Sequence, residues 1–180
     1  MPSDERAALL ALLRTKAVRR GQFKLASGQI SDYYIDGRMV TLDAEGARLI
    51  GALLAELLAR RGVQAIGGPT IGADPIIGAV IAESARRGTP LAGFLVRKEA
   101  KGHGMGKQVE GPLEKGMKAA LVDDVISTGG SVLQAADAVR ALGATVDCVT
   151  AVVDREMGAD RVFEERGIPY LPLFRKGELL

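Results

Sequence analysis

Two adjacent carboxylates followed by hydroxyl and glycine residues form the stretch of this sequence best suited to chemistry. They lie in ALVDDVISTGGS, residues 120–131, where an apolar run leads into Asp123 and Asp124 and a short loop precedes a predicted helix. Glycines let backbone amides approach an anion, hydroxyls add donors, and a helix N-terminus favours negative charge. The carboxylates can accept hydrogen bonds from sugar hydroxyls or hold hydrated Mg²⁺. The segment predicts a site for a phosphorylated sugar, and the alternative is a capped turn with two solvated acids.

A second segment combines positive charge with a lack of apolar periodicity. RKEAKGHGMGKQVEG, residues 97–111, holds four basic residues, four glycines and the only histidine, His103. Most segments of this composition are solvated surface excursions. This one follows the carboxyl end of a predicted strand, one strand before the phosphate loop, so its cations can reach a bound phosphate. An imidazole with an ordinary pKa of ~6.5 can serve as a donor or acid toward a departing oxygen.

Strands and helices alternate along the chain and must position both segments. A helix from Ser3 to Arg20 and a hairpin around residues 27–29 are predicted first, then a helix capped by Asp43 and ended by Gly62. Strand, loop and helix then repeat, with apolar strands predicted at residues 63–68, 91–96, 118–122 and 145–153. This pattern predicts an α/β fold with a parallel central sheet flanked by helices on both faces. Such sheets bind ligands at the carboxyl ends of their strands.

Composition and charge exclude several classes of protein. The formal net charge of the 180 residues is +2, so no overall field calls for nucleic acid or an anionic membrane. Cys148 is the single cysteine, which excludes an internal disulfide and fits a reducing compartment. No stretch resembles a signal peptide or reaches the roughly 18 apolar residues of a spanning helix. We expect one cytoplasmic domain, with a hood of residues 1 to about 40 beside a core of about 41–180.

The phosphate loop and three other segments resemble one enzyme family. LVDDVISTGGS resembles the motif by which type I phosphoribosyltransferases bind 5-phosphoribosyl 1-diphosphate (PRPP), and these enzymes join a base to PRPP with Mg²⁺. VRKEAKGHGMG, FKLASGQISDYYID and VVDRE resemble segments of orotate phosphoribosyltransferases, and they occur in that family's order. The resemblance covers nearly the whole chain. It implies the type I phosphoribosyltransferase fold and the conversion of orotate and PRPP to orotidine 5′-monophosphate and pyrophosphate in pyrimidine synthesis.

The resemblance also implies roles for individual residues. The residues implied to bind PRPP are Asp123, Asp124, Val125, Ile126, Ser127, Thr128, Gly129, Gly130, Ser131, Thr70, Ile71 and Gly72. The implied catalytic residues are Arg97, Lys98, Lys101 and His103. A homodimer is implied in which Arg97, Lys101 and His103 act in the partner's site while Lys98 stays in its own. Mg²⁺ is expected to bind through PRPP, with Asp123 or Asp124 reached through water.

The base is expected to lie between the hood and the end of a late strand. Arg155, with its planar fork of donors, can pair with the orotate carboxylate, and the alternative is a surface ion pair with Asp154 or Glu156. Tyr34 is expected against the pyrimidine and Tyr33 in the core, with Ser127 and the backbone near Ser27 and Gly28 also in reach of the base.

The sequence departs from the family pattern at two positions. Ala26 stands where many members carry a lysine, and Lys24, two residues earlier on the same strand face, either substitutes for it or is simply solvated. Gly72 stands where many members carry another lysine. We therefore expect pyrophosphate to be held there mainly by backbone amides of residues 70–73.

Two other functions remain open at this level. One is a phosphoribosyltransferase for a purine or for uracil, which would need neither Arg155 nor Lys101 and His103. The other is a non-enzymatic PRPP-fold regulator that binds nucleotide and nucleic acid. The second requires a basic surface outside residues 97–111, and the sequence shows no basic patch with interleaved aromatic residues there.

Overall fold

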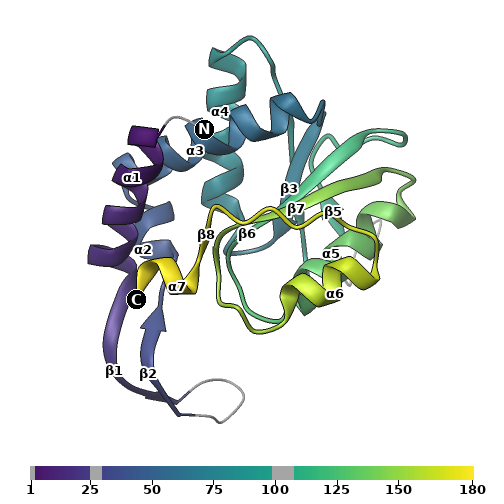
Figure 1. The fold of residues 1–180 in the computed structure, drawn as a ribbon. Coiled ribbons are helices and arrows are strands. Elements are labelled where there is room, and N and C mark those ends of the chain that lie inside the picture. The colour runs from purple at the N-terminus through teal and green to yellow at the C-terminus, as the bar shows by residue number, and fades with distance from the viewer. Residues whose placement is uncertain (1–2, 25–29, 99–107) are drawn as a thin grey trace.

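The computed structural model of the chain describes residues 3–24, 30–98 and 108–180. Its centre is a six-stranded sheet with the order β5-β4-β3-β6-β7-β8 (Figure 1). Five of the strands are parallel: β3 (Ala65–Pro69), β4 (Ala92–Val96), β6 (Lys118–Ile126), β7 (Thr145–Asp154) and β8 (Phe174–Arg175). The edge strand β5 (Val109–Glu110) is antiparallel to β4. The predicted α/β fold is confirmed, but the sheet is mixed, because a two-residue strand has no periodicity that sequence could reveal.

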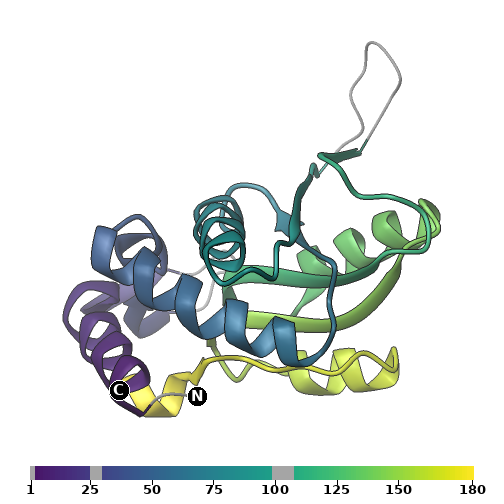
Figure 2. The ribbon, with the colours of Figure 1, turned by 90° about the horizontal axis from the view of Figure 1, so that it is seen from above.

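Alternate residues of the central strand β6 point into two hydrophobic cores, one on each face of the sheet. Ala120 and Val122 belong to the core that includes α3 (Ala44–Arg60) and α4 (Asp74–Arg86). Ala119 and Leu121 belong to the core that includes α5 (Gly130–Ala141) and α6 (Ala159–Glu165). Figure 1 shows the two pairs of helices on either side of the sheet, and Figure 2 shows α3 and α4 lying over the strands. Burial on both faces explains the near-continuous apolar strands.

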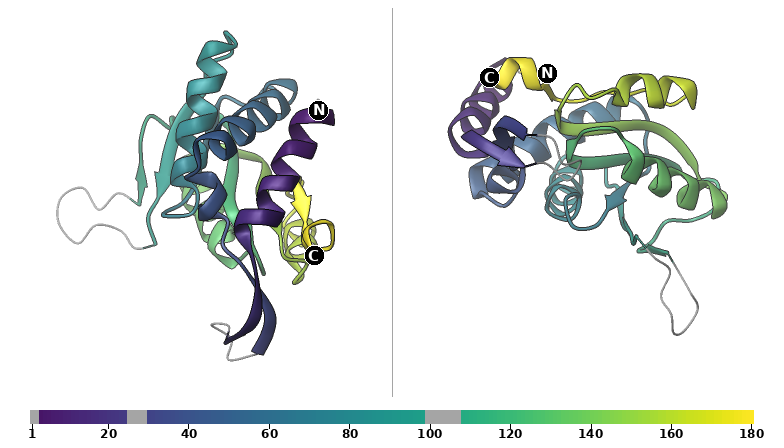
Figure 3. Two further views of the ribbon diagram at one scale, coloured as in Figure 1. Left: turned by 90° about the vertical axis from the view of Figure 1, so that its left-hand side faces the viewer. Right: turned by 90° about the horizontal axis from the view of Figure 1, so that it is seen from below.

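The hood follows a different course from the predicted one. Helix α1 (Ser3–Leu12) continues into a π-helical turn, η1 (Leu13–Ala17), and the chain then enters strand β1 (Val18–Lys24). The helix predicted to reach Arg20 therefore ends at Ala17, because Val18, Arg19 and Arg20 pair with β2 (Ile30–Ile35). The antiparallel β1–β2 hairpin is confirmed, and Figure 3 shows it projecting from the body of the molecule. Its tip, residues 25–29, lies outside the described residues.

Two short helices connect the hood to the rest of the chain. Helix α2 (Arg38–Thr41) leads from β2 into α3, whose predicted cap is confirmed: the Gly46 amide donates to the Asp43 carboxylate at 3.1 Å. The final helix, α7 (Lys176–Leu179), returns to lie beside α1 (Figures 1 and 3). Within the described ranges, every helix is too short or too polar to cross a membrane.

The carboxyl ends of the parallel strands meet at one edge of the sheet, where the hood also lies. Strand β6 extends further toward this edge than predicted. Residues 123–126 were expected in a loop, but Asp123, Val125 and Ile126 pair with β7. Hydrogen bonds to β7 extend the strand through these residues, and two adjacent acids in the sequence do not predict such an extension. The carboxylates are consequently held by a strand rather than by a loop.

Candidate active site

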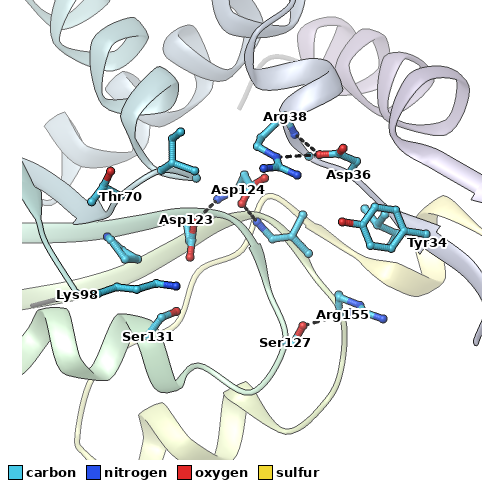
Figure 4. A pocket seen from close by; sticks show the side chains of 16 residues that line it. Tyr34, Asp36, Arg38, Thr70, Lys98, Asp123, Asp124, Ser127, Ser131 and Arg155 are labelled. Atoms are coloured by element: carbon cyan, nitrogen blue, oxygen red, sulfur yellow. Dashed lines mark hydrogen bonds and ion pairs between the residues drawn. The ribbon is translucent and has the colours of Figure 1, made fainter. Parts of the chain in front are cut away.

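A cavity of about 380 Å³ opens at the carboxyl ends of β3, β4, β6 and β7, and the hood forms one wall. Five segments supply its lining, and Figure 4 shows their side chains around a common space. The lining residues are Tyr34, Ile35, Asp36, Gly37, Arg38, Pro69, Thr70, Ile71, Gly72, Lys98, Asp123, Asp124, Val125, Ser127, Ser131 and Arg155. The cavity therefore collects residues from along most of the chain at the edge where ligands of such sheets bind.

Asp123 and Asp124 form the floor of this cavity. The Asp124 amide donates to Oδ1 of Asp123 at 3.0 Å, and the Val125 amide donates to Oδ1 of Asp124 at 2.8 Å. Burial raises the pKa of Asp123 to about 7, and the charge of Asp124 adds to the effect. Burial also raises the pKa of Asp124, against the opposing influence of the Val125 amide and of Arg38. Asp123 can thus exchange a proton near neutral pH, and the two carboxylates can accept a cation or hydrogen bonds from sugar hydroxyls.

The loop after β3 lies beside the two acids, and Thr70, Ile71 and Gly72 from this loop line the cavity. The peptide bond between Thr70 and Ile71 is cis. The Thr70 amide donates to the Val96 carbonyl and the Ala73 amide to the Pro69 carbonyl, so neither is available to a ligand. The amides of Ile71 and Gly72 have no acceptor among the described residues. Of the four backbone amides of residues 70–73 that are expected to hold pyrophosphate, only those of Ile71 and Gly72 therefore remain without an acceptor in the described part of the chain.

The loop after β6 leads into the N-terminus of α5. Gly129 adopts a left-handed conformation (φ 83°), and a side chain there would collide with the ring of Phe163. Helix α5 begins at Gly130, so its first amides lack intrahelical acceptors and its dipole favours an anion. Ser127 and Ser131 line the cavity.

Other predicted PRPP residues lie near the cavity without lining it. Thr128 and Gly129 belong to the same loop and Gly130 begins α5, but none of the three lines the cavity. Ile126 is 2% exposed and packs in the core shared with α5, so its side chain cannot contact a ligand. Its carbonyl instead accepts a hydrogen bond from the Arg155 amide at 2.8 Å.

The predicted catalytic cations separate into two groups. Lys98 lines the cavity and lies across it from Tyr34 (Figure 4). Arg97 does not line it; its guanidinium lies 3.5 Å from the Glu110 carboxylate on β5. Lys101 and His103 lie outside the described residues.

Arg155 lies at the opposite end of the cavity from Lys98. Its Nη1 is 3.4 Å from Oγ of Ser127, and its guanidinium lies 5.8 Å from the ring centroid of Tyr33. Its Nε is buried without a hydrogen-bond partner among the described residues. The alternative of an ion pair with Asp154 or Glu156 is wrong, because Asp154 pairs with Arg175 and Glu156 accepts from the Gly177 amide. The guanidinium retains donors for a ligand.

The hood contributes two aromatic residues to this end. Tyr34 lines the cavity, is 36% exposed, and packs its ring 5.7 Å from that of Phe23. Tyr33 packs against the core, as predicted. Lys24 ends β1, and its side chain, like Ala26, Ser27 and Gly28, falls outside the description.

Sequence reasoning missed a charged pair at the mouth of the cavity. Nε of Arg38 lies 3.1 Å from the Asp36 carboxylate, and both residues line the cavity beside Asp124 (Figure 4). Asp36 raises the pKa of Arg38, whose charge in turn lowers the pKa of Asp124. The only local signal was two opposite charges directly after the alternating run of β2. Arg38 is therefore the third cation, with Lys98 and Arg155, that lines the cavity among the described residues.

A sheet of this topology, with an acid pair and a helix N-terminus at its carboxyl edge, is typical of the phosphoribosyltransferases. The chain belongs to this family: the model of the phosphoribosyl transferase domain matches residues 39–166. Its relatives specify the group within the family, which is that of the orotate phosphoribosyltransferases.

Two curated relatives and one solved structure illustrate the similarity. The orotate phosphoribosyltransferase of Rhodopirellula baltica is 48% identical, over 90% of this chain and 87% of its own. That of Streptomyces coelicolor is 44% identical, over 98% of both chains. The crystal structure of Mycobacterium tuberculosis orotate phosphoribosyltransferase in complex with PRPP superposes with a TM-score of 0.83 at 35% identity, covering 97% of this chain and 98% of that one. The predicted family and fold are confirmed.

Proposed function

We propose that this chain transfers the 5-phosphoribosyl group of PRPP to orotate, which forms orotidine 5′-monophosphate and pyrophosphate in pyrimidine synthesis. The observation that carries the proposal is one cavity with two chemically distinct ends. Acids and free backbone amides occupy one end, and an arginine with unused donors occupies the other. The names of the relatives agree with this assignment.

The first end fits a phosphorylated sugar carrying a diphosphate. The N-terminus of α5, with Ser127 and Ser131, suits the 5-phosphate. Asp123 and Asp124 suit the ribose hydroxyls. The amides of Ile71 and Gly72 and the Lys98 ammonium suit the pyrophosphate.

The donors at this end also fit Mg²⁺ held mainly by the substrate. Among the described residues, no group of three or more His, Cys, Asp or Glu side chains could enclose a metal ion. Mg²⁺ usually keeps several waters and binds one or two carboxylates together with substrate phosphates. Asp123 and Asp124 provide two such carboxylates, directly or through water. When bound, the ion would neutralise charge that develops on the pyrophosphate.

The second end fits a planar base with a carboxylate. A guanidinium can bind a carboxylate through two parallel hydrogen bonds, and Arg155 lines the cavity with a single long hydrogen bond, 3.4 Å to Ser127, among the described residues. Ser127, 3.4 Å from Arg155, can contact the same ligand, and the Tyr34 ring can lie against the pyrimidine. Lys24 remains a proposed contact of the base.

The reaction proposed is a displacement at the anomeric carbon, with no protein nucleophile. Pyrophosphate departs as the ribose ring gains positive charge, and a nitrogen of orotate attacks from the opposite face. The residues therefore orient the two substrates and stabilise charge on the leaving group. Arg97, Lys98, Lys101 and His103 would supply this charge, and residues 97–107 would also exclude water from PRPP.

We further propose a homodimer in which Arg97, Lys101 and His103 act in the partner's site. The position of Lys98 in the cavity of its own chain, with Arg97 outside it, supports this division of roles. We also propose a cytoplasmic location, which the buried single thiol of Cys148 supports.

A substrate panel tests the activity. Purified protein is assayed with PRPP and Mg²⁺ against orotate, uracil, hypoxanthine, adenine and xanthine, and pyrophosphate release is measured. We expect turnover with orotate alone. Turnover of a purine or of uracil in its place would contradict the proposal, and retention of RNA or DNA at moderate salt without turnover would indicate the regulator instead.

A further inference from the structure

The residues on both sides of Arg155 are tied to the C-terminal segment of the chain. We call Arg175, Gly177 and Glu178 the C-terminal clasp. Arg175 contacts Asp154 and Gly177 contacts Glu156, and each of these contacts joins residues about 20 positions apart in sequence. The clasp belongs to neither end of the cavity, and none of its three residues lines it.

Asp154, the residue before Arg155, is the first point of attachment. It is 1% exposed, and its carboxylate accepts from Nη1 of Arg175 at 2.9 Å and from the Glu156 amide at 2.9 Å. Arg175 also bonds Asp160 through Nη1 at 2.7 Å and Nη2 at 3.2 Å. A charge buried this completely needs such a partner, so Arg175 holds the end of β7 in place.

Glu156, the residue after Arg155, is the second point of attachment. Its φ is 56°, which makes it the one non-glycine among the described residues with a left-handed backbone. Such a conformation is costly and persists only where the surroundings enforce it. The Gly177 amide donates to the Glu156 carboxylate at 3.0 Å, so the clasp supplies part of that enforcement.

The clasp is itself anchored to the hood. Oε1 of Glu178 accepts from the Arg175 amide at 2.9 Å, and Oε2 of Glu178 lies 2.6 Å from Nη2 of Arg6 on α1. The Arg6 guanidinium stacks 4.4 Å from the ring centroid of Phe174. Arg14 donates to the Glu178 carbonyl at 2.7 Å. The same hood carries Tyr34, so the clasp connects the two elements that contribute to the base end of the cavity.

Arg155 has few contacts of its own that could fix its position. Its side chain has one long hydrogen bond, 3.4 Å to Ser127, and a buried Nε without a partner in the described part of the chain. Apart from this bond and the Tyr33 ring 5.8 Å away, the place of its guanidinium depends on the backbone at residues 154–156.

We propose that the C-terminal clasp positions Arg155 for the carboxylate of the base, by holding Asp154 through Arg175 and Glu156 through the Gly177 amide. The inference rests on the proposed function, since it assigns Arg155 to orotate. Its residues are positioning residues, because none of them contacts a substrate. Their loss should weaken orotate binding and leave PRPP binding nearly unchanged.

The first experiment uses Glu156, whose side chain can be shortened without changing the backbone preference. Glu156→Ala removes the acceptor for the Gly177 amide, whereas Glu156→Gln keeps an oxygen that can accept. We expect Glu156→Ala to raise the KM for orotate roughly tenfold, with the KM for PRPP changed less than twofold, and Glu156→Gln to restore most of the loss. Gly177→Ala serves as the matched control, because its new β-carbon would lie 3.6 Å from the Glu156 carboxylate and the amide is kept.

The second experiment separates positioning from folding. Arg175→Gln removes the partner of buried Asp154, and Asp160→Asn removes only the exposed partner of Arg175. We expect Arg175→Gln to raise the KM for orotate more than Asp160→Asn does, with Arg175→Lys intermediate. The melting temperature and the KM for PRPP are measured on the same samples.

The outcomes distinguish this inference from the proposed function. A lower melting temperature or kcat with an unchanged KM for orotate, in both Glu156→Ala and Arg175→Gln, would overturn the positioning role. Equal increases in KM for orotate and PRPP would also overturn it. Absence of orotate turnover by the unmodified protein would instead contradict the proposed function, before any variant is compared.

Discussion

A β-carbon on Gly72 would lie 2.3 Å from Oδ1 of Asp123, closer than any real contact of this kind. The same carbon would lie 2.6 Å from Oδ1 of Asp124. Any side chain at position 72 therefore competes with both carboxylates for one space. A glycine therefore suits the present packing of the acids, and at this position the loop faces them with backbone.

Gly72→Ala should weaken PRPP binding. The new methyl group must displace Asp123 and Asp124 from the positions in which we propose that they bind the ribose hydroxyls, so we expect the KM for PRPP to rise roughly tenfold. Steady-state kinetics with varied PRPP measure it. Gly78→Ala on α4 is the control, since its β-carbon would meet nothing within 4 Å; equal kinetics for the two variants would contradict the packing argument.

The raised pKa of Asp123 predicts a pH-dependent loss of stability. Its pKa is 3.8 ordinarily and about 7 in the folded chain, so between these values the folded state binds more protons than the unfolded state. The free energy of unfolding then falls as pH rises from about 4 to about 7. Asp123→Asn removes this contribution. We therefore expect the stability of the variant, relative to that of the unmodified protein, to increase as pH rises from 5 to 8.

Thermal unfolding of both proteins at several pH values checks this prediction, because the other titrating groups are shared. Glu83→Gln is the control. Arg86 and Arg87 lower the pKa of Glu83 to about 2, so its contribution is constant from pH 5 to 8 and is lost only in acid. A stability difference between Asp123→Asn and the unmodified protein that stays flat with pH would refute the assignment.

Arg38→Ala should weaken PRPP binding most strongly at low pH. The Arg38 charge lowers the pKa of Asp124, so its removal lets that pKa rise and leaves more of the carboxylate protonated as pH falls. We expect the KM for PRPP to rise severalfold, because a protonated Asp124 is a weaker acceptor for the ribose hydroxyls, with a larger increase at pH 6 than at pH 8. Arg86→Ala, which removes an exposed ion pair on α4, should leave both values unchanged.

Arg155→Ala should raise the KM for orotate and leave PRPP binding nearly intact. Loss of hydrogen bonds from a charged donor costs about 1.5–3 kcal/mol, which corresponds to roughly 10- to 100-fold. Initial rates with each substrate varied in turn measure the two constants. Arg161→Ala, whose side chain is 85% exposed on α6, is the control. Similar losses for both substrates would contradict the assignment of Arg155 to the base.

Lys101→Ala should lower kcat far more than it weakens PRPP binding, by roughly 100-fold or more. Mixing it with Asp124→Asn then tests the proposed sharing of residues 97–107 between subunits. A mixed dimer contains one site built from the intact parts of both chains, so we expect the mixture to recover activity that neither variant has. No recovery after verified exchange of subunits would show that Lys101 acts in its own chain. If removing Lys101 and His103 together costs little activity, their catalytic role is wrong.

The chemistry of this protein was readable from local sequence. An apolar run ending in Asp123 and Asp124, followed by Ser127 to Ser131, specifies a strand, a loop and a helix start within a dozen residues. The alternation of strands and helices and the cap at Asp43 are equally local, and the structure confirms them. Each depends on periodicity or spacing over one or two elements, which is the range over which sequence patterns act.

Contacts between distant segments decided the rest. The change from helix to strand at Val18 depends on pairing with Ile35, and the exclusion of a side chain at Gly72 depends on Asp123. Arg38 reaches the cavity only because the hood packs beside the sheet, and Arg6 meets Glu178 across 172 positions of sequence. No local pattern encodes such pairs, since their energy arises only when folding brings the two partners together. The residues proposed to bind a phosphorylated sugar could thus be predicted from the sequence, whereas their arrangement was decided by the tertiary structure.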